Sequence, residues 1–455
     1  MKEITSVCNG IGGNVVVIGL GRSGLAAARL LKKKGARVKV SEVSQGNNEI
    51  GERAKLLLDE GIEVETGRHS LSLIDEASLV VVSPGVPQQA APISHARRRG
   101  VPVISELELA ACFCRAPLIA IGGTNGKSTT VTLLVEIFKR AGKPALIAGN
   151  IGYPLCDFVD ELTPFDLVVV EVSSFQLETI KSFRPWIAIL LNITPDHLDR
   201  YNNSFDNYTQ AELELFRNQS ADDYALLNDD DPLVRMAPTK ARVIKFSQRN
   251  ELSEGTFVKD GWVYSRFDGK EKAILSCDEI KLHGVHNREN VLAAVTAAII
   301  YGVDSKDIGN VLRRFSGLEH RVEFVREVAG VRFINDSKGT NVGAVLKSLE
   351  SISSPIILIA GGRGKGADFS CLTELAAAKV KVAILLGEAT DVMEKALMEA
   401  VQVKRVDSLN EAVRLAHSLA NEGDTVLLSP GCSSLDMFAN FEERGEAFKK
   451  MVRDL

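Results

Sequence analysis

A lysine and a serine that follow a glycine turn are the residues whose spacing most clearly predicts chemistry in this chain. The apolar run 118–121 ends in two glycines, and the apolar residues of 131–140 recur with helical spacing. Between them, the N–H groups of the turn and the helix dipole attract phosphate, the Lys127 ammonium adds charge, and the Ser128 hydroxyl can hold Mg²⁺. The sequence therefore predicts a nucleoside-triphosphate site at Gly123, Thr124, Asn125, Gly126, Lys127, Ser128 and Thr129. The loop is shorter than the usual pattern, which would need a glycine at Ile121.

A Mg-ATP site also needs a carboxylate near the phosphates, and Glu171 is the candidate because it ends the strand-like run 166–171. The alternative is a surface glutamate beside a helix that Ser173 or Ser174 caps. His197 lies between two aspartates in a loop after another apolar run, where a lone histidine is often structural. We therefore expect Ser128 and Glu171 to hold metal.

Two lysines stand in polar loops of the C-terminal third, Lys338 in 335–340 and Lys365 in the glycine-rich 361–366. By default they are solvated charges. They could instead neutralise a carboxylate substrate or a transferring phosphoryl group. A third loop, 429–436, also follows a strand-like run, so we expect a binding face at one edge of this region.

The first motif of the chain is a second glycine turn. The β-branched run 14–19 leads into Gly19-Leu-Gly-Arg-Ser-Gly24, and Glu42 ends the next strand-like run, in the position that would hold a ribose hydroxyl of NAD. This pattern is weak by itself, because the same turn binds any diphosphate, including that of a nucleotide sugar. Both interpretations remain open at this point.

These motifs require strands and helices to position them, and the chain alternates apolar strand-like runs with helical stretches throughout. We predict an α/β protein of three domains: 1–105 Rossmann-like, 106–316 a central ATPase domain with a mostly parallel sheet, and 317–455 again Rossmann-like. Within the central domain, 243–274 has the alternating pattern of a small antiparallel patch.

Composition limits the function classes. The chain has 455 residues, 45% hydrophobic and 25% charged, and a net charge of −5, which offers no general attraction to nucleic acid or to an anionic membrane. No run reaches the ~20 apolar residues that span a bilayer, and the first residues lack the pattern of a signal peptide. Seven scattered cysteines predict reduced, mostly buried thiols. We expect a cytoplasmic protein.

Eight segments together resemble the Mur ligase family over essentially the whole chain, and the shortened phosphate loop is a feature of that family. They are Gly123-Thr-Asn-Gly-Lys-Ser-Thr129, Gly149-Asn-Ile-Gly152, Glu171-Val-Ser-Ser-Phe-Gln-Leu-Glu178, Leu191-Asn-Ile-Thr-Pro-Asp-His-Leu-Asp-Arg200, Gly284-Val-His-Asn-Arg-Glu-Asn290, Gly317-Leu-Glu-His-Arg321, Asn335-Asp-Ser-Lys-Gly-Thr-Asn341 and Leu428-Ser-Pro-Gly-Cys-Ser-Ser-Leu-Asp-Met-Phe438.

The resemblance implies an ATP- and Mg²⁺-dependent ligase that adds D-glutamate to UDP-N-acetylmuramoyl-L-alanine through an acyl phosphate. It implies catalytic roles for Lys127, Glu171, His197, Glu212 and Lys338, with His197 at a second metal. It implies ATP contacts from Asn287, Asn290, Arg321 and Asp336. It implies contacts with the nucleotide sugar from Leu20, Ser23, Glu42, Gly85 and Asn150, and contacts with D-glutamate from Lys338, Thr340, Lys365, Ser434, Leu435 and Phe441. A monomer is expected.

One departure from the family concerns the second metal. The family usually places a carbamylated lysine at the position that Glu212 occupies here. A glutamate supplies the same charge on a stem shorter by ~3–4 Å. We expect direct or water-mediated replacement of the carbamate, and the alternative is an acid on a helix surface.

Three other functions remain possible from the sequence. A related ligase would add a different amino acid, such as L-alanine or a diamino acid, or extend folylpolyglutamate. A dinucleotide-dependent dehydrogenase would explain residues 19–42 but would leave the loop at 123–128 unused. A non-catalytic ATP-driven switch would hydrolyse or bind ATP without joining substrates.

Overall fold

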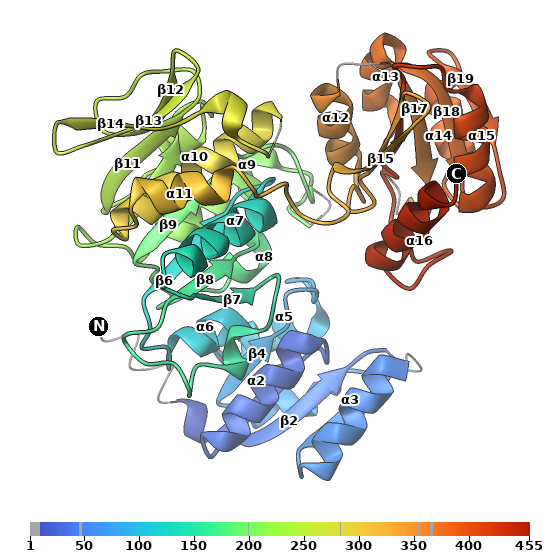
Figure 1. Ribbon diagram of the computed structural model, residues 1–455. Coiled ribbons are helices and arrows are strands. Elements are labelled where there is room, and N and C mark those ends of the chain that lie inside the picture. The colour runs from blue at the N-terminus through green and yellow to red at the C-terminus, as the bar shows by residue number, and fades with distance from the viewer. Residues whose placement is uncertain (1–9, 45–47, 199, 283, 353–354, 365–366) are drawn as a thin grey trace. The chain divides into compact units, whose positions relative to one another are not determined.

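The computed structural model describes residues 10–44, 48–198, 200–282, 284–352, 355–364 and 367–455. The chain divides into two compact units, Met1–Phe315 and Ser316–Leu455 (Figure 1). Unit 1 contains two sheets and unit 2 contains a third. The predicted α/β class is confirmed, with one mostly parallel sheet in each of the three predicted regions of the chain.

The first sheet is fully parallel, with strand order β3-β2-β1-β4-β5. Its central strands are runs of Val and Ile that are buried on both faces, as a covered parallel sheet requires. The strands are β1 (Asn14–Ile18), β2 (Arg37–Glu42), β3 (Glu63–Thr66), β4 (Leu79–Val82) and β5 (Val103–Ser105). The helices around it are η1 (Gly10–Gly12), α2 (Arg22–Lys33), α3 (Asn48–Asp59), α4 (Ser72–Asp75) and α5 (Ala91–Arg98).

The second sheet has strand order β14-β13-β12-β11-β10-β9-β6-β8-β7. Its strands are β6 (Leu118–Gly122), β7 (Leu146–Gly149), β8 (Val168–Glu171), β9 (Ile187–Leu190), β10 (Tyr224–Asn228), β11 (Arg242–Ser247), β12 (Gly255–Lys259), β13 (Trp262–Phe267) and β14 (Lys270–Ser276). The helices are α6 (Glu106–Ala111), α7 (Lys127–Arg140), η2 (Leu155–Asp157), α8 (Ser174–Leu177), α9 (Phe205–Leu213), η3 (Glu214–Phe216), η4 (Val234–Met236), η5 (Cys277–Glu279), α10 (Val285–Ile300) and α11 (Ser305–Leu312).

The two faces of the second sheet belong to different cores. On one face, α7, α10 and α11 lie together and bury alternate strand residues such as Ile119 and Ile121 (Figure 1). On the other face, Leu118 and Ala120 join a core that continues through α6 into α2 of the first sheet. Because one apolar core serves both sheets, the two sheets form a single compact unit.

The third sheet has strand order β15-β16-β20-β17-β18-β19, and only β15 is antiparallel to its neighbour. Helices α12 to α14 cover one face, and α15 and α16 cover the other. The strands are β15 (Glu323–Val328), β16 (Val331–Asn335), β17 (Ile356–Gly361), β18 (Val380–Leu386), β19 (Gln402–Arg405) and β20 (Thr425–Leu428). The helices are α12 (Val342–Ser351), η6 (Ser370–Leu372), α13 (Thr373–Lys379), α14 (Thr390–Leu397), α15 (Leu409–Leu419) and α16 (Phe441–Arg453).

Two expectations need correction. In the predicted antiparallel patch, β11 pairs in parallel with both β10 and β12, and only β12 to β14 run antiparallel.

The expectation of mostly buried thiols is also wrong. Among the described cysteines, all of which are free, Cys156 and Cys432 are buried but Cys371 is exposed. Cys8 lies outside the described residues.

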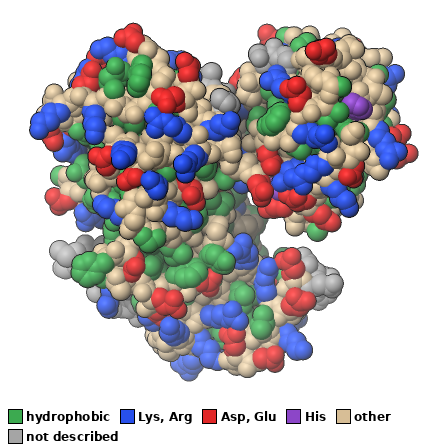
Figure 2. Space-filling model, viewed as in Figure 1, with side chains coloured by type: hydrophobic (Ala, Val, Ile, Leu, Met, Phe, Trp, Pro, Cys, Tyr) green, Lys and Arg blue, Asp and Glu red, His purple; other side chains and the backbone are tan. Residues whose placement is uncertain are grey.

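The surface agrees with the modest net charge. Figure 2 shows acidic and basic side chains interspersed on the face that it draws. Within the described ranges, every helix is too short or too polar to reach across a lipid bilayer.

Candidate active site

The glycine turn between β6 and α7 has the backbone that the sequence predicts for a phosphate loop. Gly123 and Gly126 have φ values of 111° and 92°, in the left-handed region that favours glycine. A Cβ on Gly126 would lie 2.1 Å from Oδ1 of Asn290, and one on Gly123 would lie 2.8 Å from the carbonyl oxygen of Asn192. The loop therefore packs against its neighbours so closely that glycine is required at both positions. Its last glycine directly precedes Lys127, the first residue of α7.

The Lys127 side chain folds back over this turn. Its ammonium donates hydrogen bonds to the carbonyl oxygens of Gly123, at 2.5 Å, and Thr124, at 3.0 Å. The ammonium thus lies beside the N-terminal end of α7, where the helix dipole is positive and backbone N–H groups lack helical partners. A loop with this positive charge and these free N–H groups is of the kind that binds phosphate.

Asn192, two residues after β9, holds the middle of the loop. Its carbonyl oxygen accepts from the N–H of Thr124 at 2.8 Å, and its Oδ1 accepts from the N–H of Asn125 at 2.9 Å. Its Nδ2 donates in return to the Asn125 carbonyl at 3.0 Å. Sequence reasoning missed this residue, because its role depends on β9 lying next to β6 in the sheet.

Glu212 lies under the loop from the other side. Its Oε2 accepts from the N–H of Gly123 at 3.0 Å, and its Oε1 accepts from the Tyr208 hydroxyl at 3.0 Å. The Tyr208 hydroxyl is also 2.8 Å from Oγ1 of Thr124. The Glu212 side chain is only 2% exposed, so the alternative of a helix-surface acid is wrong. Burial raises the pKa of this carboxyl, and the Lys127 charge and the two hydrogen bonds oppose that shift.

Glu171 occupies the end of β8, directly beside β6, where it pairs in register with Ile121. It is 2% exposed, so the alternative of a surface glutamate is wrong. Its Oε1 accepts from Nδ2 of Asn150 at 2.8 Å. Its Oε2 is buried and has no hydrogen-bond partner among the described residues. A buried carboxylate oxygen with unused lone pairs, next to the hydroxyl-bearing start of α7, is a donor set that fits Mg²⁺.

His197 lies on an exposed loop with a positive φ of 52°. Its ring meets the ring of Phe175 edge-on, with the centroids 4.8 Å apart. The backbone N–H of His197 donates a hydrogen bond to Oδ1 of Asp196 at 2.9 Å. Phe175 belongs to α8, the short helix that follows Glu171. The aromatic contact therefore links the His197 loop to the strand end that carries the buried carboxylate.

The start of α10 adjoins the phosphate loop. Asn290 is 5% exposed, and its Nδ2 donates to Oδ1 of Asn287 at 3.2 Å. The close approach of Asn290 to Gly126 places this pair at the N-terminus of α7. Two of the residues expected to contact ATP, Asn287 and Asn290, are thus brought to the loop that contains Lys127.

In the first glycine turn, Glu42 holds the backbone of its own turn. Both carboxylate oxygens of Glu42 accept from the backbone: Oε2 from the N–H of Leu20 at 2.7 Å and Oε1 from the N–H of Ser44 at 2.9 Å. These bonds outweigh burial and lower the pKa of Glu42. Glu42 therefore closes the turn from inside. Gly85 is exposed, Ser23 is partly exposed and the Leu20 side chain is fully buried, so the side chain of Leu20 faces the core.

In unit 2, Asp336 is buried at the end of the β16 strand region. Its Oδ2 accepts from the hydroxyls of Ser348, at 2.6 Å, and Ser429, at 2.7 Å, and its Oδ1 accepts from the N–H of Val322 at 3.3 Å. Burial raises its pKa to about 6. The carboxylate thus joins three segments of unit 2, a structural role that sequence reasoning missed. Arg321, next to Val322, is partly exposed.

The residues expected to contact the amino acid belong to unit 2, and two of them lie close together at the start of α16. The Lys338 ammonium lies 5.4 Å from the ring centroid of Phe441, at the start of that helix. Ser434 is buried, whereas Thr340 and Leu435 are exposed. Lys365 lies outside the described residues.

Comparisons with known proteins match most of the chain in three consecutive parts. Family models match residues 13–105 (Mur ligase MurD-like, N-terminal domain), 121–298 (Mur ligase middle domain) and 320–432 (Mur ligase, glutamate ligase domain). The UDP-N-acetylmuramoylalanine–D-glutamate ligase of Pelotomaculum thermopropionicum is 48% identical, with 97% of each chain covered. The ligase of the same name from Geotalea daltonii is 47% identical, with 98% of each chain covered. A solved pseudomurein peptide ligase type C from Methanothermus fervidus shares the fold, with a TM-score of 0.61, 20% identity, and coverage of 97% of this chain and 99% of that one.

Proposed function

This chain belongs to the Mur ligase family, and we propose that it is the ligase that joins D-glutamate to UDP-N-acetylmuramoyl-L-alanine with hydrolysis of ATP to ADP and phosphate. The observation that carries this proposal is full-length similarity, at 47–48% identity, to ligases named for that reaction. The phosphate loop and the buried Glu171 supply the chemistry that such a reaction needs. The dehydrogenase alternative would leave the phosphate loop at 123–128 unused, and these full-length relatives are named as ligases.

ATP would bind at the turn between β6 and α7. The loop N–H groups and the Lys127 ammonium would hold its β- and γ-phosphates, and Asn287, Asn290, Arg321 and Asp336 would contact its adenosine. For Asp336 this requires contact through its backbone or by rearrangement, since its carboxylate accepts from Ser348 and Ser429. Ser128, Glu171, His197 and Glu212 are the residues that would hold Mg²⁺, which when bound neutralises phosphate charge.

The reaction requires an activated carboxylate. An oxygen of the alanyl carboxylate attacks the γ-phosphorus, the bond to the bridging β-γ oxygen breaks, and ADP leaves. The amine of D-glutamate then attacks the carbonyl carbon of the acyl phosphate, loses a proton and expels phosphate, which leaves the amide. The Lys127 ammonium would neutralise charge on the transferring phosphoryl group, and Lys338 would act on the side of the incoming amino acid.

Glu212 would take the place of the carbamylated lysine that the family usually carries. Its two oxygens each accept one protein hydrogen bond, and each retains a further lone pair for a metal ion or a metal-bound water. The carboxylate therefore supports the loop and could also balance metal charge, directly or through water. No carbon dioxide chemistry would be needed at this position.

Nucleotide sugar would bind at the edge of the first sheet, near Ser23, Glu42, Gly85 and the backbone of Leu20, with Asn150 directed toward its muramoyl-alanine arm. D-Glutamate would bind in unit 2 at Lys338, Thr340, Lys365, Ser434, Leu435 and Phe441. We further propose that the enzyme is a cytoplasmic monomer, that it serves the synthesis of peptidoglycan precursors, and that it binds neither nucleic acid nor membrane.

An ADP-release assay tests the proposed function. The purified enzyme, with Mg-ATP and UDP-N-acetylmuramoyl-L-alanine, is offered D-glutamate, L-glutamate, L-alanine and a diamino acid in separate reactions. We expect ADP release that requires both the sugar nucleotide and D-glutamate. Release with another amino acid alone would instead identify a related ligase, and release without any acceptor would identify an ATP-driven switch.

A further inference from the structure

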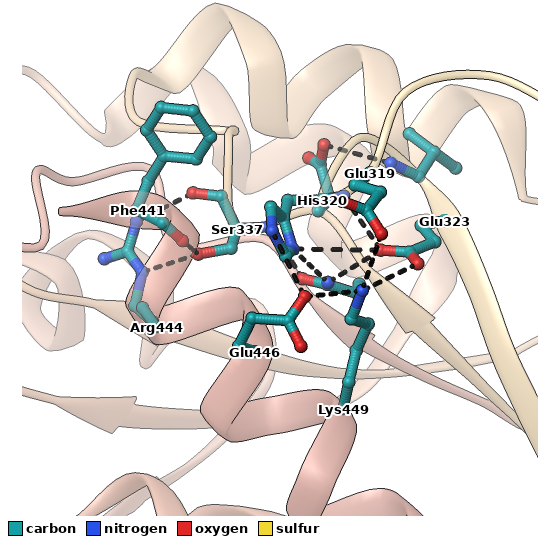
Figure 3. A network of polar contacts seen from close by, with 11 residues as sticks. Glu319, His320, Glu323, Ser337, Phe441, Arg444, Glu446 and Lys449 are labelled. Carbon is teal, nitrogen blue, oxygen red and sulfur yellow. Dashed lines mark hydrogen bonds and ion pairs between the residues drawn. The ribbon is translucent and has the colours of Figure 1, made fainter.

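Three loops follow strand ends on one edge of the third sheet, and one buried arginine donates hydrogen bonds to two of them and lies near the third. The described residues of these loops are 335–341 after β16, 362–364 after β17 and 429–436 after β20. Arg444, in the first turns of α16, lies beneath them and is 2% exposed. Figure 3 shows its guanidinium directed toward Ser337, in the first of these loops.

The contacts of Arg444 are to backbone and hydroxyl groups. Its Nε donates to Oγ of Ser337 at 3.0 Å, and its Nη2 donates to the carbonyl oxygen of Ser337 at 2.8 Å (Figure 3). The same Nη2 donates to the carbonyl oxygen of Cys432, in the third loop, at 3.2 Å. In the second loop, a Cβ built on Gly362 would lie 3.4 Å from Nη1, so a side chain at this position would meet the guanidinium.

Ser337 extends this arrangement to the start of α16. Its hydroxyl accepts from Arg444 and donates to the carbonyl oxygen of Phe441 at 2.8 Å. The arginine and the serine thus fix the first loop to the helix that carries Phe441. Lys338, the next residue, has its ammonium 5.4 Å from the centre of the Phe441 ring.

A guanidinium is rarely buried without a carboxylate partner, because its desolvation is costly. Burial lowers the pKa of Arg444 to about 10. The Arg444 guanidinium therefore stays buried despite its cost of desolvation. This is expected of a residue whose hydrogen bonds fix the positions of two loops.

We propose that Arg444 is a positioning residue for the amino-acid substrate, because it holds in register the loops that carry Lys338 and Ser434 and the helix end that carries Phe441. This inference rests on the proposed function, in which these three residues contact D-glutamate. Arg444 itself is buried beneath them and acts through them. Its loss would therefore weaken binding of the amino acid selectively.

A neighbouring cluster of charged side chains, partly on α16 and partly in segment 319–323, supports the first loop. Glu319, His320 and Glu446 approach closely enough to suggest a metal site, but the Lys449 ammonium lies 2.7 Å from Glu446 and 3.2 Å from Glu323 (Figure 3). The ammonium already supplies the positive charge there. This cluster supports the first loop at its other end, since Nδ2 of Asn335 lies 2.9 Å from Nδ1 of His320.

The test compares Arg444→Lys and Arg444→Met with the wild-type enzyme in the ADP-release assay. Loss of one hydrogen bond from a charged donor changes an equilibrium by roughly tenfold. We therefore expect the KM for D-glutamate to rise by about tenfold or more in Arg444→Met and by less in Arg444→Lys. The KM values for ATP and for the sugar nucleotide should not change.

Lys379→Met is the matched control. The Lys379 ammonium also donates to carbonyl oxygens, those of Leu349, Glu350 and Ile352, but at the C-terminal end of α12, away from the three loops. We expect this variant to lower the melting temperature of unit 2 without a change in the KM for D-glutamate. Equal effects of Arg444→Met and Lys379→Met on all three KM values would overturn the proposal, since both would then report general destabilisation.

Ser337→Ala gives a second measurement if Arg444→Met does not fold. It removes the hydroxyl that links Arg444 to Phe441 and should also raise the KM for D-glutamate selectively. An unchanged KM in a folded Ser337→Ala or Arg444→Lys enzyme would refute the positioning role while leaving the proposed function intact. A wild-type enzyme that does not use D-glutamate would refute the proposed function itself.

Discussion

Replacement of Glu212 offers a sharp test of how the phosphate loop is held. This carboxylate is buried, and it accepts one hydrogen bond from the loop, at Gly123, and one from Tyr208. In Glu212→Gln the side chain keeps its size and can still accept from Gly123, but it loses its charge. In Glu212→Ala both donors lose their acceptor. The two variants therefore separate the charge of the residue from its support of the loop.

The magnitudes follow from the two contacts. A hydrogen bond to a charged group contributes about 1.5–3 kcal/mol and a neutral one about 0.5–1.5, so neutralising both costs about 2 kcal/mol. That corresponds to a roughly 30-fold loss in kcat/KM for ATP. Removing both bonds in Glu212→Ala costs ~3–6 kcal/mol, or roughly 10²- to 10⁴-fold, with the lower end expected if water enters the site.

The assay measures ADP release at varied ATP with saturating sugar nucleotide, D-glutamate and Mg²⁺. Glu214→Gln, two residues further on and paired with Arg217 at the surface, is the control and should retain normal activity. Because replacing a buried carboxylate with an amide removes a desolvation cost, Glu212→Gln should not melt at a lower temperature than the wild-type protein. A Glu212→Gln enzyme with wild-type kcat/KM would refute the need for charge, and an active Glu212→Ala enzyme would refute both roles.

Adding bicarbonate to the assay distinguishes a glutamate carboxylate from a carbamylated lysine at position 212. A glutamate needs no carbon dioxide, so bicarbonate should leave the wild-type activity unchanged. Glu212→Lys restores the residue that the family usually carbamylates, and bicarbonate should raise the activity of that variant. Stimulation of the wild-type enzyme would show that a carbamate forms elsewhere in this chain.

Three further predictions concern buried or phosphate-facing charges. Lys127→Ala should lower the rate of ADP release by roughly 10²- to 10³-fold, and normal ligation by this variant would contradict the proposed ATP site. Glu171→Gln should raise the Mg²⁺ concentration needed for half-maximal activity, as a Mg²⁺ titration would measure, because the unpaired Oε2 loses its charge; an unchanged titration would argue against a metal there. Burial raises the pKa of Glu106 to about 7. The folded protein therefore holds a proton that the unfolded chain releases between about pH 4.5 and 7, so stability falls as pH rises through this window, by on the order of 3 kcal/mol. Glu106→Gln should remove that part of the pH dependence of the melting temperature, and an identical pH profile in both proteins would contradict it.

Much of the architecture could be predicted because buried parallel strands are encoded locally. Runs such as Leu79–Val82 and Val168–Glu171 are continuous β-branched segments, and each ends in a turn whose residues identify it. Shorter or more polar elements were not predicted. The edge strands Glu63–Thr66 and Gln402–Arg405 contain charged residues that give no strand pattern, and they are strands because a neighbouring strand offers hydrogen bonds.

Some residues of the candidate site are likewise marked by a local motif, and others are brought together only by the fold. The sequence could indicate Lys127, Ser128 and Glu171, since each lies at a strand end or helix start that a local motif marks. It could not indicate Asn192 or Arg444, because their hydrogen bonds join segments that are far apart in the chain. It marked Glu42 as a ligand contact, which stays a prediction, and it could not show that each Glu42 oxygen also accepts a backbone hydrogen bond that holds the turn.

The sequence by itself determined the order of strands and helices, the glycine turns, and the residue types available at each strand end, because these depend on neighbours a few positions away. Only the tertiary structure decided which of those residues are buried and which donors their oxygens meet. Glu212 and Glu171 show the physical reason. Each has the same carboxylate. Among the described residues, packing leaves one oxygen of Glu171 without a hydrogen-bond partner and engages both oxygens of Glu212, and burial makes an unpaired oxygen costly.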